Sequence, residues 1–121
     1  MKDKIMIRDL LLRTIIGLND WEREKKQDVV LNITLYVDIK KPGQSDEIEH
    51  TTNYKAITKH VIDVVENSDY KLLEKLVSHI AYDIVHKFGV KKTTVSIDKL
   101  HALRFSRSVA LEITREKHDF E

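Results

Sequence analysis

The chain of 121 residues contains no cysteine, a single proline and only three glycines. The lack of cysteine excludes disulfides, thiolate catalysis and metal sites built from cysteine. So little glycine and proline argues against long flexible linkers, and the length suits a single domain over residues 1–121. The sequence also has no apolar run long enough to cross a membrane and no signal-like apolar stretch near its start. We therefore expect a soluble, cytoplasmic protein with no membrane partner.

Charge is abundant but balanced, with 21 lysine and arginine residues against 20 aspartate and glutamate residues. No block of like charge dominates, so the sequence predicts no nucleic-acid partner. The basic residues from Arg23 to Lys26 are interrupted by Glu24 and are interpreted as a solvated turn.

The clearest pattern is an alternation of apolar and more polar residues between positions 29 and 39. The apolar positions are Val29, Leu31, Ile33, Leu35, Val37 and Ile39. This period of two predicts a long strand with one buried face. A preceding strand is expected over residues 5–18, with an irregularity at Arg8-Asp9, and residues 19–27 would join the two as a hairpin. Pro42-Gly43 predicts a turn after the second strand.

Two amphipathic helices are predicted next. Thr51 to Asn53 offers a cap for the first helix, and Ser68-Asp69 offers a cap for the second. The second helix has a strongly apolar face and is expected to end at Gly89. His60, His79 and His86 are interpreted as helix-surface residues.

The last third of the chain returns to strand. We expect strands over residues 94–99 and 107–115, with Val109, Leu111 and Ile113 facing inward. The resulting order ββααββ predicts an α+β fold with a four-stranded antiparallel sheet and two helices on one face. Such a sheet has two open edges, which neighbouring subunits would cover.

Four polar residues occupy notable places on these elements. Lys99 ends a strand, Tyr54 follows a helix cap, Glu74 lies in an apolar helix, and Glu22 follows Trp21 in the first loop. Each has an ordinary explanation, because lysines and glutamates are usually solvated and the tyrosine ring can pack on the sheet. Brought together by folding, the four would instead form an acid/base site.

These positions and their spacing resemble the dihydroneopterin aldolase family. The resemblance runs from Ile7 to Arg115 and includes Asn53-Tyr54, Leu72-Leu73-Glu74 and the Ile-Asp-Lys-Leu-His-Ala-Leu-Arg segment at 97–104. That segment looks most like the dihydroneopterin triphosphate 2'-epimerase branch. Aldolases usually place proline after the lysine, whereas Pro42 is the only proline here. Asp20-Trp21-Glu22 is more similar to some bacterial aldolases.

The resemblance implies the tunnelling fold, in which such sheets join around a ring into a continuous barrel. It therefore implies a homo-oligomer, a tetramer or an octamer, with active sites shared between subunits. Relatives of this fold that use zinc bind it through a His-x-His strand pair and another histidine. None of the six histidines forms such a pair, so neither a metal nor a cofactor is predicted.

The resemblance also implies roles for site residues. Glu74, with Leu73, would anchor the guanidine-like edge of a dihydropterin through a bidentate carboxylate. Tyr54 would cover the pterin from the adjacent subunit, helped by Thr51, Thr52 and Asn53. Lys99 and Tyr54 would take part in proton transfer, and Glu22 would hold the hydroxylated side chain and its water. His101 lies two residues past Lys99 and is a further substrate-binding residue in this interpretation.

The function implied is epimerisation at C2' of 7,8-dihydroneopterin triphosphate by retro-aldol and aldol steps. Arg104 and Arg107 would bind its phosphates, although both also suit ordinary surface positions. The alternative is the aldolase of folate biosynthesis, which gives 6-hydroxymethyl-7,8-dihydropterin and glycolaldehyde. A third interpretation is a non-catalytic scaffold that binds pterins or purines through Glu74.

Overall fold

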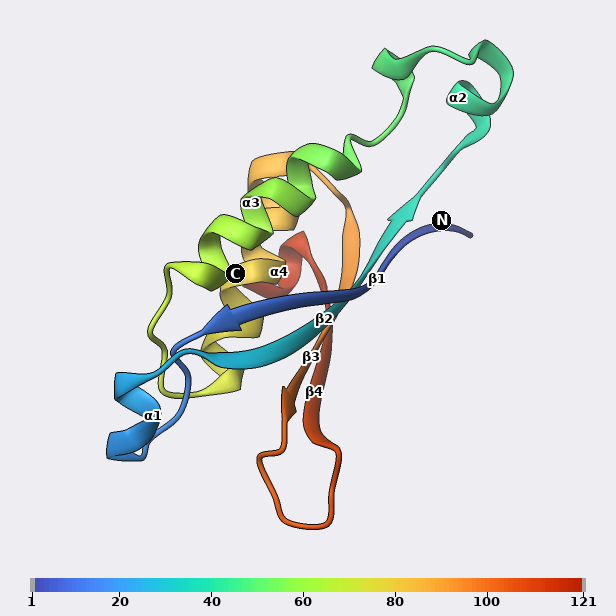
Figure 1. The fold of residues 1–121 in the computed structure, drawn as a ribbon. Helices are drawn as coiled ribbons and strands as arrows, with labels where there is room; N and C mark the ends of the chain where they lie inside the picture. Colours follow the sequence, from blue (N-terminus) through green and yellow to red (C-terminus); the bar gives the residue numbers. More distant parts are fainter. Residues whose placement is uncertain (1, 121) are drawn as a thin grey trace.

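The computed structural model describes residues 2–120, in which a four-stranded antiparallel sheet packs against two long helices (Figure 1). The strands lie in the order β1-β2-β3-β4. Their bounds are Asp3–Thr14 for β1, Gln27–Val37 for β2, Lys92–Leu100 for β3 and Ser108–Glu116 for β4. The predicted α+β architecture is confirmed, and β1 and β4 form the two edges of the sheet.

The alternation in β2 places one face of the strand against the helices. Val29, Leu31, Ile33, Leu35 and Val37 are all buried. The strand ends two residues earlier than expected, because Ile39 is exposed and a short helix α2, Lys40–Ser45, begins after it. Pro42 is therefore part of a helix rather than of a simple turn. It lies in the first helical turn, where a backbone N–H has no partner to lose.

The first strand contains the predicted irregularity. Its register against β2 shifts between Ile7 and Leu10, and Asp9 adopts a left-handed backbone with φ +54°. The displaced N–H of Asp9 donates to Asn32 Oδ1 at 2.9 Å, so a polar side chain of β2 compensates for the interrupted ladder. The strand ends at Thr14 rather than Leu18, and the chain continues as irregular structure.

The two helices, α3 (Tyr54–Glu66) and α4 (Leu73–Phe88), cover one face of the sheet (Figure 1). Asn53 caps α3 as predicted, because its Oδ1 accepts the N–H of Ala56 at 3.1 Å. Gly89 ends α4 with a left-handed φ of +67°, as is common at the end of a helix. The prediction that Ser68-Asp69 caps α4 is wrong. That helix starts at Leu73, and Ser68 instead donates to the carbonyl of Val65 at the end of α3.

A buried carboxylate joins the two helices. Asp83 of α4 is 4% exposed, and its Oδ2 lies 2.7 Å from His60 Nε2 of α3 and 3.3 Å from His79 Nε2. His60 and His79 are therefore half-buried partners of Asp83 rather than plain surface residues, whereas His86 is exposed as expected. No helix within residues 2–120 has the length and apolar character that a membrane span requires.

The hairpin of β3 and β4 extends beyond the helices (Figure 1). Leu111 and Ile113 of β4 are half-buried and pack against the core, as predicted. Val109 lies on the same face of β4, but it is near the end of the hairpin, remains 37% exposed and lines a cleft rather than the core. A 3-10 turn, η1 (Ile48–His50), precedes α3, and another, η2 (Lys117–Phe120), follows β4.

Candidate active site

A cleft of about 330 Å³ lies where the β1–β2 connection, the start of α4 and the end of β3 meet. Its lining comprises Ile16, Gly17, Leu18, Asn19, Glu22, Lys71, Leu72, Leu73, Glu74, Lys99, Ala102 and Val109. Four residues singled out in the sequence, Glu22, Leu73, Glu74 and Lys99, thus come together in one chain. Three larger hollows lie elsewhere, two beside α4 and the C-terminal turn and one along the first half of α3, and none of these four residues lines them.

Glu22 is placed by a short helix that the sequence did not indicate. The segment expected to be a charged loop contains the five-residue helix α1, Asp20–Glu24. Glu22 is only 4% exposed. Its Oε1 accepts the backbone N–H of Asn19 at 3.1 Å and the Asn19 side-chain amide at 2.8 Å. Its Oε2 receives a hydrogen bond from Lys99 Nζ at the end of β3.

Two further residues fix this carboxylate. Gln27 Nε2 lies 3.4 Å from Glu22 Oε2 and donates to the carbonyl of Ile16 at 2.7 Å. Gly17 has φ +126°, and a Cβ at this position would lie 2.3 Å from the Glu22 carboxylate. Any side chain at Gly17 would therefore displace Glu22. Asn19, Gln27 and Gly17 were not predicted as site residues, because isolated amide side chains and a single loop glycine give no pattern in the sequence.

The charge of Glu22 is set by this environment. Burial by itself would raise the pKa of Glu22, but the hydrogen bond from Lys99 opposes it, assisted by the bonds from Asn19 and Gln27 and by the positive charge of Lys99. The result is a pKa lowered to about 2. Glu22 is thus an anion at neutral pH, and its role there is that of an acceptor rather than an acid.

Glu74 occupies another side of the cleft, in the first turn of α4. A carboxylate is favoured at this end of a helix, because the unpaired backbone N–H groups carry partial positive charge. Its side chain is exposed, and Leu73 beside it is half-buried against the core. The Glu74 carboxylate is therefore solvent-exposed and available to a ligand in the cleft.

The tip of the β3–β4 hairpin borders the cleft only in part. Ala102 is in the lining, whereas His101, Arg104 and Arg107 are exposed and lie outside the lining that residues 2–120 provide. The guanidinium of Arg107 is 4.0 Å from Asp98 Oδ2, and that of Arg104 lies 5.1 Å from the ring centre of the fully exposed Phe105.

Tyr54 and the residues before it lie at the opposite end of the molecule. The start of α3 points toward the end of the molecule that carries α2 in Figure 1, whereas α1 and the α3–α4 connection are at the other end of the sheet. Thr51 and Thr52 line a small hollow with the end of β2, and Tyr54 is 49% exposed. One chain therefore does not bring Tyr54, Thr51, Thr52 or Asn53 to the cleft that contains Glu74.

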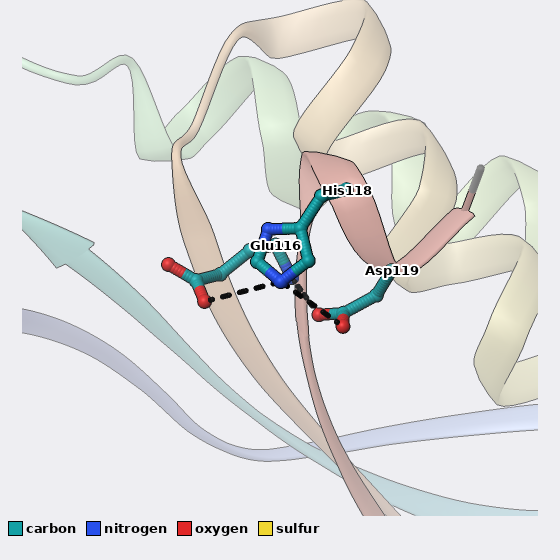
Figure 2. Close-up of side chains that lie close together, drawn as sticks. All are labelled: Glu116, His118 and Asp119. Atoms are coloured by element: carbon teal, nitrogen blue, oxygen red, sulfur yellow. Dashed lines mark hydrogen bonds and ion pairs between the residues drawn. The ribbon is translucent and has the colours of Figure 1, made fainter.

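Glu116, His118 and Asp119 form a separate cluster of possible metal ligands (Figure 2). His118 Nε2 lies 4.0 Å from Glu116 Oε2 and 3.5 Å from Asp119 Oδ1. Asp119 also accepts the backbone N–H of Glu116 at 2.7 Å, which closes the turn between β4 and η2. The cluster lies at the far end of β4 from Val109 and so takes no part in the cleft.

Solved structures of known proteins share this fold. The structure superposes on that of Escherichia coli dihydroneopterin aldolase in complex with neopterin with a TM-score of 0.90 and 26% identity, over 93% of this chain and 98% of the other. The fold is thus the predicted tunnelling fold, here described for a single chain.

The chain belongs to the dihydroneopterin aldolase family, since the FolB family model matches residues 5–114. It is 37% identical to dihydroneopterin triphosphate 2'-epimerase of Escherichia coli K12, over 93% of this chain and 94% of the relative. It is also 37% identical to the enzyme of that name from Pseudomonas aeruginosa, over 91% of this chain and 89% of the relative. The family resemblance read from the sequence is confirmed.

Proposed function

We propose that this protein is a 7,8-dihydroneopterin triphosphate 2'-epimerase. The observation that carries the proposal is the buried Glu22–Lys99 pair in the same cleft as the exposed carboxylate of Glu74. Glu74 suits the flat, guanidine-like edge of a pterin, which presents two N–H donors. The pair then meets the hydroxylated side chain at the other end of the ligand. The 37% identity to epimerases from two organisms supports this branch of the family.

The chemistry follows from these positions. A base removes the proton of the 2'-hydroxyl group, the C1'–C2' bond breaks, and its electron pair moves into the imine of the dihydropterin ring. The aldehyde fragment turns over, the bond forms again on its other face, and C2' is inverted. Lys99 passes the protons, while anionic Glu22 orients Lys99 and accepts hydrogen bonds from substrate hydroxyl groups or water. No covalent attachment to Lys99 is required, because the ring imine already stabilises the electron pair.

The complete site is proposed to contain residues of two subunits. Tyr54 of a neighbouring copy, with Thr51, Thr52 and Asn53, would cover the pterin held by Glu74, since these residues lie at the opposite end of their own chain. The open edges β1 and β4 are suited to pairing between copies. We propose a ring-shaped homo-oligomer, a tetramer or more specifically an octamer of two rings, acting in the cytoplasm.

The second candidate function is that of dihydroneopterin aldolase, which the family model and the neopterin complex of a structural relative favour. Both activities share the bond-breaking step. If the fragment escapes and C1' is protonated, the products are 6-hydroxymethyl-7,8-dihydropterin and glycolaldehyde.

The test is to incubate the protein separately with dihydroneopterin triphosphate and with dihydroneopterin, and to separate the products. An epimerase converts the triphosphate to its C2' epimer faster than either substrate loses its side chain. Release of glycolaldehyde as the main reaction would assign the aldolase function. Tight pterin binding with no turnover of either compound would indicate a scaffold.

A further inference from the structure

Arg23 makes an unusual set of contacts next to the cleft. Its Nη1 donates to the carbonyl of Gly17 at 3.1 Å and to that of Tyr70 at 3.2 Å. Its Nη2 donates to the carbonyl of Asp69. The side chain is half-buried, so the expectation of a solvated turn is wrong for this residue. Three main-chain oxygens from two segments far apart in sequence thus share one guanidinium group.

The two segments form two walls of the cleft. Gly17 begins the stretch that leads to Asn19 and Glu22, and Asp69 and Tyr70 directly precede the stretch Lys71–Glu74. The backbone N–H of Gly17 also donates to the carbonyl of Tyr70 at 3.4 Å. Two adjacent residues of α1 therefore bind different parts of the protein. Glu22 bonds to Lys99, and Arg23 bonds to the α3–α4 connection.

The chemistry of the guanidinium group suits this role. These carbonyls lie in irregular structure, where no sheet or helix ladder supplies them with donors. Arginine carries five N–H groups in a rigid planar fork, so it can satisfy several acceptors while fixing their relative positions. A lysine ammonium group is a single point of charge on a flexible stem and does not fix two segments in this way.

We propose that Arg23 is a positioning residue that sets the separation between the Glu22–Lys99 pair and Glu74. The proposal rests on the proposed function, because that separation must match the distance between a pterin ring edge and its side chain. Arg23 itself does not line the cleft that residues 2–120 form. It acts through the two walls that it joins.

The test compares Arg23→Met, which keeps an apolar stem without donors, and Arg23→Lys with a control variant that loses a buried hydrogen bond away from the cleft. Thr93→Val is the control, because buried Thr93 donates to the carbonyl of Thr34 at 2.8 Å near the start of β3, away from the cleft. Neopterin affinity is measured by fluorescence, and turnover of dihydroneopterin triphosphate is measured well below each melting temperature.

We expect neopterin binding about tenfold weaker in Arg23→Met and turnover reduced by roughly a hundredfold, since a displacement of about 1 Å between reacting groups has that effect. Arg23→Lys should recover only part of the loss, and Thr93→Val should retain wild-type values. Amide hydrogen exchange should increase in residues 17–24 and 69–74 together in Arg23→Met, and in neither segment in the control.

The proposal is overturned if folded Arg23→Met binds and turns over pterins normally. It is also overturned if amide hydrogen exchange in that variant increases in only one of the segments 17–24 and 69–74, or in neither. Failure of the proposed function would appear in the wild-type protein, which would then bind or convert no pterin. Failure of the Arg23 proposal would appear in the variants alone.

Discussion

At the scale of single residues, the Glu22 carboxylate shows how a buried charge is kept in this fold. It is 4% exposed, yet both oxygens accept hydrogen bonds and a lysine lies against it. Removing a partner from such a charge costs more than the bond itself contributes, because the remaining group stays buried. Asn19, Gln27 and Gly17 therefore belong to the site as much as Glu22 does.

The lowered pKa of Glu22 predicts a pH dependence of stability. Between pH 4.5 and about 2 the unfolded chain binds a proton at Glu22 that the folded protein does not bind. Stability from this residue is present above pH 4.5 and is lost as pH falls through that window. Urea denaturation at pH 5 and pH 3 should show a decrease that is smaller in Glu22→Gln than in the wild type, by on the order of 1–2 kcal/mol. Exposed Glu24 provides the control Glu24→Gln, and equal decreases in all three proteins would contradict the prediction.

Glu74 is predicted to supply pterin affinity rather than stability. Its carboxylate is exposed at the cleft, so Glu74→Ala should leave the melting temperature within a few degrees of the wild type. Loss of a charge-assisted bidentate contact should weaken neopterin binding by about 2–3 kcal/mol, or tens to hundreds of fold. Titration by fluorescence measures this, with Lys75→Ala as the neighbouring control. Unchanged affinity in folded Glu74→Ala would place the pterin anchor elsewhere.

At the scale of elements, the cleft is assembled from the ends of elements and the connections between them. The β1–β2 connection brings Glu22, the start of α4 brings Glu74, and the end of β3 brings Lys99. Rigid helices and strands position these ends, while the hairpin of β3 and β4 projects away from the helix layer (Figure 1). All the residues at its tip, from His101 to Arg107, are exposed.

The arginines of this tip lead to a prediction about substrate choice. In the variant with Arg104→Ala and Arg107→Ala, turnover of dihydroneopterin triphosphate should fall about tenfold or more relative to that of dihydroneopterin, since only the triphosphate offers anionic oxygens to guanidinium groups. Added salt should reduce the wild-type preference, because exposed charge contacts are screened. The ratio of kcat/KM for the two substrates is the measurement. An unchanged ratio would show that phosphate is bound by other residues.

At the scale of the whole molecule, one chain separates the residues that the family resemblance joins. Glu74 and Lys99 lie at one end of the sheet, and Tyr54 starts α3 at the other end. The sheet also presents β1 and β4 as open edges. Association of copies would satisfy both features at once, by pairing edges and by bringing Tyr54 of one subunit to the cleft of the next.

A mixing experiment tests this arrangement. Tyr54→Phe and Glu74→Ala should each have low activity, and refolding an equal mixture should restore activity at about a quarter of the sites if each site takes one residue from each of two subunits. Sedimentation at micromolar concentration should show a tetramer or an octamer. A fully active monomer, or a mixture no more active than its components, would show that each chain carries a complete site.

The sequence by itself determined the four strands, the two long helices and their order. The alternation in β2, the Asn53 cap and Gly89 depend on local periodicity and on hydrogen bonds within a few residues, which a sequence displays directly. The irregularity at Arg8-Asp9 was also visible, because two charged residues interrupt the apolar stretch between residues 5 and 12.

Only the tertiary structure decided the geometry of the cleft. Glu22 and Lys99 are 77 positions apart in sequence, and the resemblance to a family, not their pattern, suggested that they meet. The contact of Gly17 with Glu22, the three carbonyls bound by Arg23 and the start of α4 at Leu73 had no local signal. Each depends on where a distant segment lies, and packing of the helices on the sheet sets that position.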